Sequence, residues 1–145
     1  MSGIVCAIRG GPASQPTIEL AIQSAQKYDL PIYFLYIVDL NFLRSSNSSR
    51  AQVIMEEMEE MGEFILLVTQ TKAEAQGVVA HGVVRKGEVS EEIIALSHEV
   101  GANYVILGQP KREKKSVFTA DLLNAFASRI ATQTGAEVLF AEALG

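Results

Sequence analysis

The sequence predicts a doubly wound α/β fold, in which a five-stranded parallel sheet carries four helices in three layers. Short apolar runs rich in β-branched residues recur along the 145 residues, which is typical of strands buried on both faces. Segments with apolar residues at helical spacing lie between these runs. Such alternation favours right-handed βαβ crossovers. We expect a single domain over residues 1–145, large enough to fold without disulfides or structural metal.

The first two strands and the helix between them are predicted from the amino-terminal third. Residues 4–8, IVCAI, form an apolar run that stops at an arginine and two glycines. Ser14 is a candidate N-cap with Pro16 in the first helical turn. Apolar residues follow at helical spacing: Ile18, Ala21, Ile22 and Ala25. The second strand is PIYFLYIVD, residues 31–39, which ends in an aspartate.

The middle of the chain predicts a long helix and a third strand. A polar, serine-rich loop, NFLRSSNSSR at residues 41–50, comes first. The helix after it ends near Gly77, and we assign its apolar face to the core, methionines included: Ile54, Met58, Met61, Ile65 and Val68. The third strand, VVAHGVV at 78–84, is interrupted by Gly82.

Two more helices and two more strands complete the pattern. A third helix, closed by Gly101, has this apolar face: Val89, Ile93, Leu96 and Val100. The fourth strand is YVILG at 104–108, and the basic segment KREKK at 111–115 follows it. A fourth helix that stops at Gly135 has its own apolar positions: Leu122, Leu123, Phe126 and Ile130. The fifth strand is AEVLFA at 136–141.

Composition and charge narrow the class of partner. The chain is 48% hydrophobic and 20% charged, with a formal net charge of −5, so no overall positive field attracts nucleic acid or an anionic membrane. No apolar run reaches the roughly 20 residues of a membrane span, and no signal-like amino terminus is found. We therefore expect a cytoplasmic protein. Cys6 is the only cysteine; its apolar surroundings predict a buried core residue.

The motifs of several enzyme classes are missing. A dinucleotide-binding turn would need glycines at positions 10, 12 and 15, where the chain has Gly10, Pro12 and Gln15. No Walker phosphate loop occurs, and His81 and His98 lie in no ligand cluster, so we expect solvated histidines and no metal site. No set of nucleophile, base and orienting residue can be assembled. The sequence does not indicate an enzyme, and we expect no catalytic residue.

Ligands of a doubly wound sheet bind at the carboxyl ends of its strands. The candidate positions are therefore residues 9–14, Val38 with Asp39, and Gly108 onward. The KREKK segment could neutralise a phosphate or contact an acidic partner. A solvated basic loop is the simpler interpretation in a chain of net negative charge.

Four segments carry a resemblance to the universal stress protein family that covers nearly the whole chain. They are RGGPAS, YIVD, VVRKGEVSEEIIALSHEVGANYVILG and LLNAFASRIATQTGAEVLF. The resemblance implies a Rossmann-like, three-layer sandwich of the adenine nucleotide alpha hydrolase-like type. It also implies a regulatory protein of the stress response that forms a homodimer, often through its last strand.

ATP-binding members of that family carry an aspartate after the first strand and a motif of Gly, two residues, Gly, nine residues, then Gly-Ser or Gly-Thr. Here Arg9 stands at the aspartate position, Gly108 matches the first glycine and Lys111 replaces the second. The last pair aligns with Asn124-Ala125 only if the loop is about three residues longer. The resemblance gives the following candidate contacts of a degenerate site: Arg9, Gly10, Gly11, Ser14, Ile37, Val38, Asp39, Gly108, Lys111, Asn124 and Ala125.

Three hypotheses follow for the function of the carboxyl edge of the sheet. The first is a regulatory homodimer with protein partners, no chemical step and a broken ATP site, whose cleft an Arg9–Asp39 pair could fill. The second is a switch that binds ATP or another adenine nucleotide through a more basic site: Arg9, Lys111, Arg112, Lys114 and Lys115. The third, an adenine nucleotide hydrolase of related fold, lacks support because the SGGxDS and HxGH motifs are absent.

Overall fold

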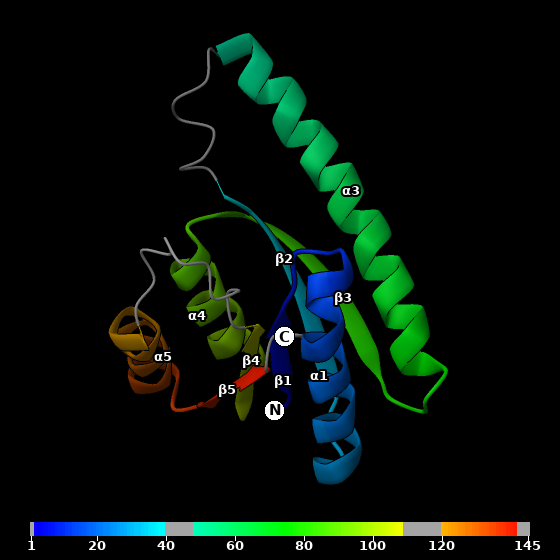
Figure 1. Cartoon of the computed structure of the whole chain (residues 1–145), viewed down its shortest axis with the longest axis vertical. Helices are drawn as coiled ribbons and strands as arrows, with labels where there is room; N and C mark the ends of the chain where they lie inside the picture. Colours follow the sequence, from blue (N-terminus) through cyan, green and yellow to red (C-terminus); the bar gives the residue numbers. More distant parts are fainter. Residues whose placement is uncertain (1, 40–47, 109–119, 142–145) are drawn as a thin grey trace.

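A computed structural model gives the fold of the chain and describes residues 2–39, 48–108 and 120–141 (Figure 1). Within these residues, five strands form one sheet in the order β3-β2-β1-β4-β5, each parallel to its neighbours. The strands are β1 (Ile4–Ala7), β2 (Ile32–Asp39), β3 (Ala80–Gly87), β4 (Tyr104–Gly108) and β5 (Glu137–Ala141). The predicted parallel sheet is confirmed, and its strands lie close to the expected positions.

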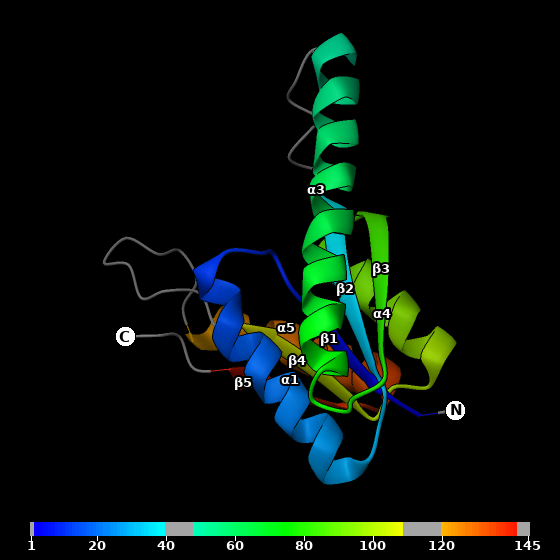
Figure 2. The same ribbon diagram turned by 90° about the vertical axis from the view of Figure 1, so that its right-hand side faces the viewer.

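Helices cover both faces of this sheet (Figure 2). α1 (Gln15–Tyr28) and α3 (Ser48–Glu74) pack on one face, whereas α4 (Val89–Val100) and α5 (Ala120–Thr134) pack on the other. A short 3-10 turn, η1 (Pro12–Ser14), precedes α1. The result is the three-layer arrangement that the alternation of strands and helices predicted.

Alternation along β1 divides the core into two halves. Ile4, Cys6 and Ile8 point to the α1 and α3 side, and Val5 points to the α4 and α5 side. Successive residues of a strand face opposite sides, so a strand covered on both sides is apolar throughout. Cys6 is fully buried, as predicted, and this burial raises the pKa of its thiol.

The strand order creates a switch point at the centre of the sheet. From β1 the chain adds β2 and β3 on one side, then returns to place β4 and β5 on the other side. β1 and β4 are therefore neighbouring strands that are followed by helices on opposite faces of the sheet, α1 after β1 and α5 after β4. In sheets of this kind the crevice for a ligand opens at such a point.

The face that the long helix turns to the sheet is predicted only in part, because Ile54, Met58 and Ile65 pack against the core as expected, whereas two other residues do not. Met61 and Val68 were assigned to the core, but their side chains are 57% and 54% exposed. The buried face instead includes Gly62 and Thr69. Gly62 lies against the Tyr36 ring, and the Thr69 hydroxyl donates to its own helix backbone. Small residues, and polar residues whose side chains bond to their own helix backbone, allow close packing there. A pattern of large apolar side chains does not reveal such positions.

The third strand is longer than predicted and is not interrupted at Gly82. In β3 this glycine keeps the parallel register with Phe34 of β2. A Cβ atom at Gly82 would lie 2.6 Å from the Gln70 side-chain oxygen and 3.0 Å from Leu66 Cβ, both on α3. The glycine therefore permits close approach of helix and strand rather than breaking the strand.

Candidate functional site

The carboxyl edge of the sheet contains the ends of β1, β2 and β4. Arg9 follows β1, Asp39 closes β2 and Gly108 closes β4. The register of β1 with its two neighbours places the ends of β1 and β4 beside each other, and β2 extends further. The parallel sheet thus brings these three predicted site positions to one edge.

The loop between β1 and α1 is fixed by its own hydrogen bonds. Gly10 and Gly11 have left-handed backbone angles, with φ of 88° and 80°. The buried Ser14 hydroxyl accepts from the Gly10 backbone N–H at 3.1 Å and donates to the Gly10 carbonyl at 3.2 Å. Ser14 is the N-cap residue of α1, as predicted, but its side chain makes no capping bond because the hydroxyl turns back to the loop.

Side chains of α1 and α3 pack closely against this edge of the sheet. A Cβ atom at Gly10 would lie 2.5 Å from Ile65 Cδ1 of α3, and one at Gly108 would lie 2.8 Å from Thr17 Oγ1 of α1. Both distances are shorter than Cβ contacts in folded proteins, so both positions require glycine or a local shift. The sequence marked both glycines as site candidates but did not predict the residues packed against them.

Arg9 and the end of β2 differ in what they present to solvent. The Arg9 side chain is exposed, and ion pairs between described residues do not include an Arg9–Asp39 pair. The Val38 side chain is fully buried on the α3 side of the sheet, whereas Ile37 is half-buried on the α4 side. Val38 can therefore offer a ligand its backbone only, while Asp39 and Ile37 retain exposed side-chain surface.

The remaining predicted contacts lie on α5 or outside the described residues. Asn124 and Ala125 are exposed in the second turn of α5. No hydrogen bond or ion pair connects them with the described ends of β1 and β4. Lys111, with the rest of the KREKK segment, lies outside the described residues. Of this motif, the described residues place Gly108 at the carboxyl edge of the sheet.

Residues 1–140 match a family model described as the universal stress protein family. The chain belongs to this family. Universal stress protein MJ0531 of Methanocaldococcus jannaschii is 26% identical over 137 residues, which are 94% of this chain and 79% of that protein. The fold and the family predicted from the sequence are thus both confirmed.

Solved structures of other universal stress proteins share the fold. One, in complex with cAMP, superposes with a TM-score of 0.69 at 18% identity and covers 99% of this chain and 98% of its own. Another, from Arabidopsis thaliana with AMP bound, has a TM-score of 0.67 at 12% identity and covers 100% of this chain and 94% of its own. At these identities the likeness concerns the three-layer α/β architecture.

A polar cluster at the start of α4 in this universal stress protein was not predicted. The Glu88 carboxylate accepts from the Glu91 backbone N–H at 2.9 Å and from the Ser90 hydroxyl at 2.7 Å. Arg129 of α5 donates to the same Ser90 hydroxyl at 2.7 Å. Desolvation raises the pKa of Glu88, but these hydrogen bonds and the Arg129 charge outweigh it, so the pKa lies below its usual value. The acidic start of the helix, EVSEE, was the available signal.

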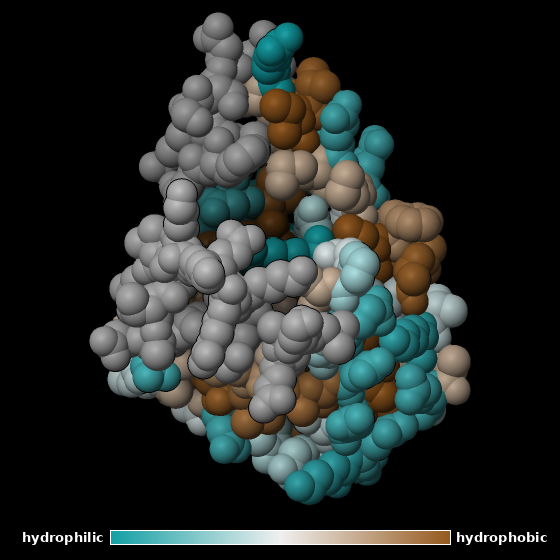
Figure 3. Space-filling view, in the orientation of Figure 1, coloured by the Kyte–Doolittle hydropathy of each residue, from teal (hydrophilic) through white to brown (hydrophobic). Residues whose placement is uncertain are grey.

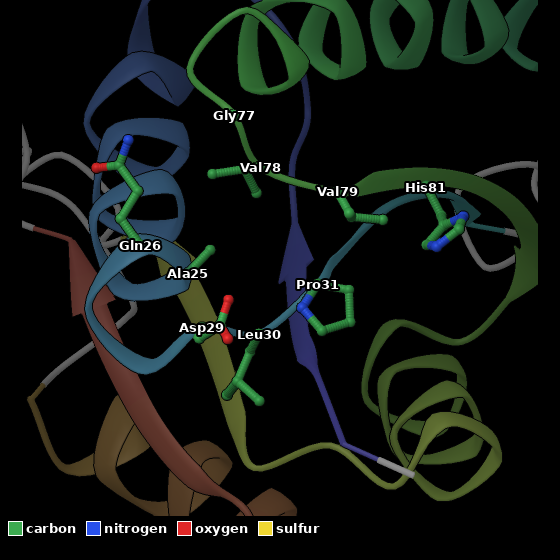
Figure 4. Close-up of a pocket in the computed structure, with 9 residues that line it drawn as sticks. All are labelled: Ala25, Gln26, Asp29, Leu30, Pro31, Gly77, Val78, Val79 and His81. Atoms are coloured by element: carbon green, nitrogen blue, oxygen red, sulfur yellow. The ribbon is translucent and has the colours of Figure 1, made fainter.

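A pocket of about 540 Å³ opens at the opposite, amino edge of the sheet (Figure 4). It lies between the end of α1 and the segment that leads into β3, and its lining includes Gln26, Asp29, Pro31 and His81. His81 is exposed and stacks on the Tyr33 ring at 4.9 Å. This pocket shares no residue with the predicted site.

The described residues contain no group of three or more His, Cys, Asp or Glu side chains placed to hold a metal ion. In the same residues no helix is long and apolar enough to cross a membrane.

Proposed function

We propose that this universal stress protein is a regulatory binding protein of the stress response with a degenerate ATP site and no chemical step of its own. Arg9 carries the proposal. Its exposed side chain follows β1 at the carboxyl edge, where the family resemblance places an aspartate in ATP-binding members.

A guanidinium cannot accept a hydrogen bond from the adenine amino group as an aspartate does. Arginine has only hydrogen-bond donors, whereas the exocyclic amino group of adenine needs an acceptor. The loop after Arg9 offers little compensation, because the Ser14 hydroxyl already bonds to Gly10. We therefore propose that the adenine contact is lost and that ATP affinity falls below the micromolar range of a functional site.

A second candidate is a switch that binds an adenine nucleotide in a changed manner. The exposed charge of Arg9 at an edge with left-handed glycines favours it, since arginine pairs well with phosphate oxygens. Relatives crystallised with cAMP and AMP share the fold. In this hypothesis Arg9 binds phosphate instead of facing the base.

Calorimetric titration with ATP, ADP and AMP distinguishes the two candidates. For the degenerate site we expect no binding by the wild-type protein at millimolar nucleotide, and at least tenfold tighter ATP binding after Arg9→Asp. For the switch we expect micromolar binding that Arg9→Glu abolishes. Lys27→Glu is the matched control, because Lys27 lies near the end of α1 at the opposite edge. The same loss with Lys27→Glu would show a general charge effect and contradict the switch.

We also propose that the protein acts in the cytoplasm as a homodimer that binds protein partners. Among the described strands β5 lies at one margin of the sheet and pairs with β4 alone. An open strand margin is a natural pairing surface. Light scattering should give at least twice the chain mass of 15.7 kDa. A monomeric mass at all concentrations would contradict the homodimer.

A further inference from the structure

Helix α3 carries a second apolar face that no described part of the chain covers. Large hydrophobic side chains on this helix are 54% to 67% exposed: Val53, Met61, Phe64, Leu67 and Val68. Figure 2 shows α3 extending past the body of the protein at its amino end, and Figure 3 shows brown surface groups along its course. We call Met61, Phe64, Leu67 and Val68 the α3 patch.

The α3 patch lies opposite the face that packs on the sheet. Residues three, four and seven apart share one side of a helix, which groups Met61 with Phe64 and Val68. The sheet-facing side includes Leu66 and Ala73, which are 3% and 0% exposed. A surface helix normally has one apolar side. Grouped exposed side chains of this size mark an interaction surface.

We propose that a second copy of this chain covers the α3 patch, with the two α3 helices antiparallel about a two-fold axis near Phe64. Such an axis brings Phe64 against its own counterpart and Met61 against Leu67 of the second copy. A self-complementary patch of this kind suits an isologous contact. The interface joins apolar side chains that each chain alone leaves in water.

Charge along the helix favours a second copy in the antiparallel direction. Five of the six glutamates of α3 lie between residues 56 and 63, and the sixth, Glu74, ends the helix: Glu56, Glu57, Glu59, Glu60, Glu63 and Glu74. Lys72 stands in the last turn. An antiparallel pair centred on Phe64 places Glu57 beside Lys72 of the second copy, whereas a parallel pair would place the two 56–63 segments together.

Glu57 and Lys72 of the second copy are suited to form an ion pair across the interface. Among the described residues Glu57 has no ion-pair partner, while Glu59 is already paired with Lys86 at 2.8 Å. Lys72 donates to the Gln15 side-chain oxygen at 2.8 Å, a neutral group that leaves the lysine charge unbalanced. A carboxylate brought near Lys72 is therefore attracted, and the end-to-end charge pattern selects the direction of the partner helix.

The first test measures the mass of the full chain by light scattering over a range of concentrations. We expect Phe64→Glu to halve the assembly mass of the wild-type protein and to keep the same circular dichroism, because Phe64 is 67% exposed. The control is Val79→Glu, which places the same charge at a residue that is 61% exposed outside α3. It should leave the mass unchanged.

Two outcomes of this test overturn the proposal. One is an equal mass for Phe64→Glu and the wild-type protein, which would leave the α3 patch to a partner of another kind. The other is an equal loss of mass with Val79→Glu. If β5 also forms an interface, Phe64→Glu reduces a tetramer to a dimer; if it does not, the variant reduces a dimer to a monomer. Failure of the β5 dimer is thus distinguishable from failure of the α3 contact.

A second test examines the direction of the helices by oxidative cross-linking. Phe64→Cys should form a disulfide with its counterpart because both residues lie near the axis. Val53→Cys should not, since an offset of 11 residues on each chain separates the two thiols by about 33 Å along the helices. Cys6 is fully buried and does not compete. Equal cross-linking of the two variants would overturn the antiparallel contact.

Discussion

Gly10 and Gly11 share a left-handed backbone but differ in their surroundings. A Cβ atom at Gly10 would meet Ile65, whereas one at Gly11 would have no atom within 4 Å. The two residues therefore separate the cost of backbone conformation from the cost of a steric clash. Their position between β1 and α1 makes this difference relevant to the candidate site.

We predict that Gly11→Ala lowers the free energy of unfolding by about 1–3 kcal/mol, because its φ of 80° and ψ of 175° lie in a backbone region that essentially only glycine adopts. Gly10→Ala should cost at least about 1 kcal/mol more, because Ile65 must also move. Urea denaturation of the two variants measures the difference. Equal losses in the free energy of unfolding would show that Ile65 of α3 moves away from the new side chain without cost.

Glu88 links the stability of α4 to pH. Its pKa in the folded protein is below the usual value. The ionised carboxylate therefore contributes stability above pH ~4.3, the ordinary glutamate pKa, and this contribution is lost as the pH falls through the lower folded value.

We predict that Glu88→Ala costs about 1 kcal/mol at pH 7, as expected for loss of a helix cap, and that the difference from the wild type shrinks in acid. Thermal unfolding between pH 3 and 7 would be measured for both proteins. Glu19→Ala, an exposed position on α1, is the control and should show no such pH dependence. A Glu88→Ala loss that is constant across this range would contradict the account.

At the scale of elements, the sequence predicts most strands and helices but only part of the face that α3 turns to the sheet. The buried runs of β1, β2 and β4 are clear because both sides of these strands are covered. In α3 both sides are apolar, so residue spacing alone cannot decide which side packs on the sheet. Gly62 decides it, since the Tyr36 ring occupies the space where a side chain would be. That contact joins residues far apart in the sequence.

Gly62→Ala increases the helix propensity of α3 but disturbs its packing on the sheet. In an exposed helix this change would stabilise by about 1 kcal/mol, but here the new Cβ would lie 2.4 Å from the Tyr36 ring. We predict a net loss of stability of about 1–3 kcal/mol, as for other overpacked cores. Chemical denaturation gives the sign directly, and a gain in stability would show that α3 does not pack on β2 as described.

At the scale of the whole molecule, the sequence predicts the edge that holds the candidate site. Parallel strands place Arg9, Asp39 and Gly108 at the same edge of the sheet whatever the strand order, and the order β2-β1-β4 makes them neighbours. The order of strands and the burial of Val38 require contacts between distant segments, and the sequence does not supply them. Asn124 and Ala125 depend on a longer loop for their alignment, and their exposed positions on α5 leave that part of the prediction untested.

The central claim is that Arg9 removes adenine recognition from a fold whose relatives include nucleotide complexes. Titration of the wild-type protein with ATP, followed by calorimetry, tests this claim most directly. We predict no measurable heat of binding up to millimolar ATP. Saturable binding in the micromolar range would contradict the claim and establish a nucleotide site with changed contacts.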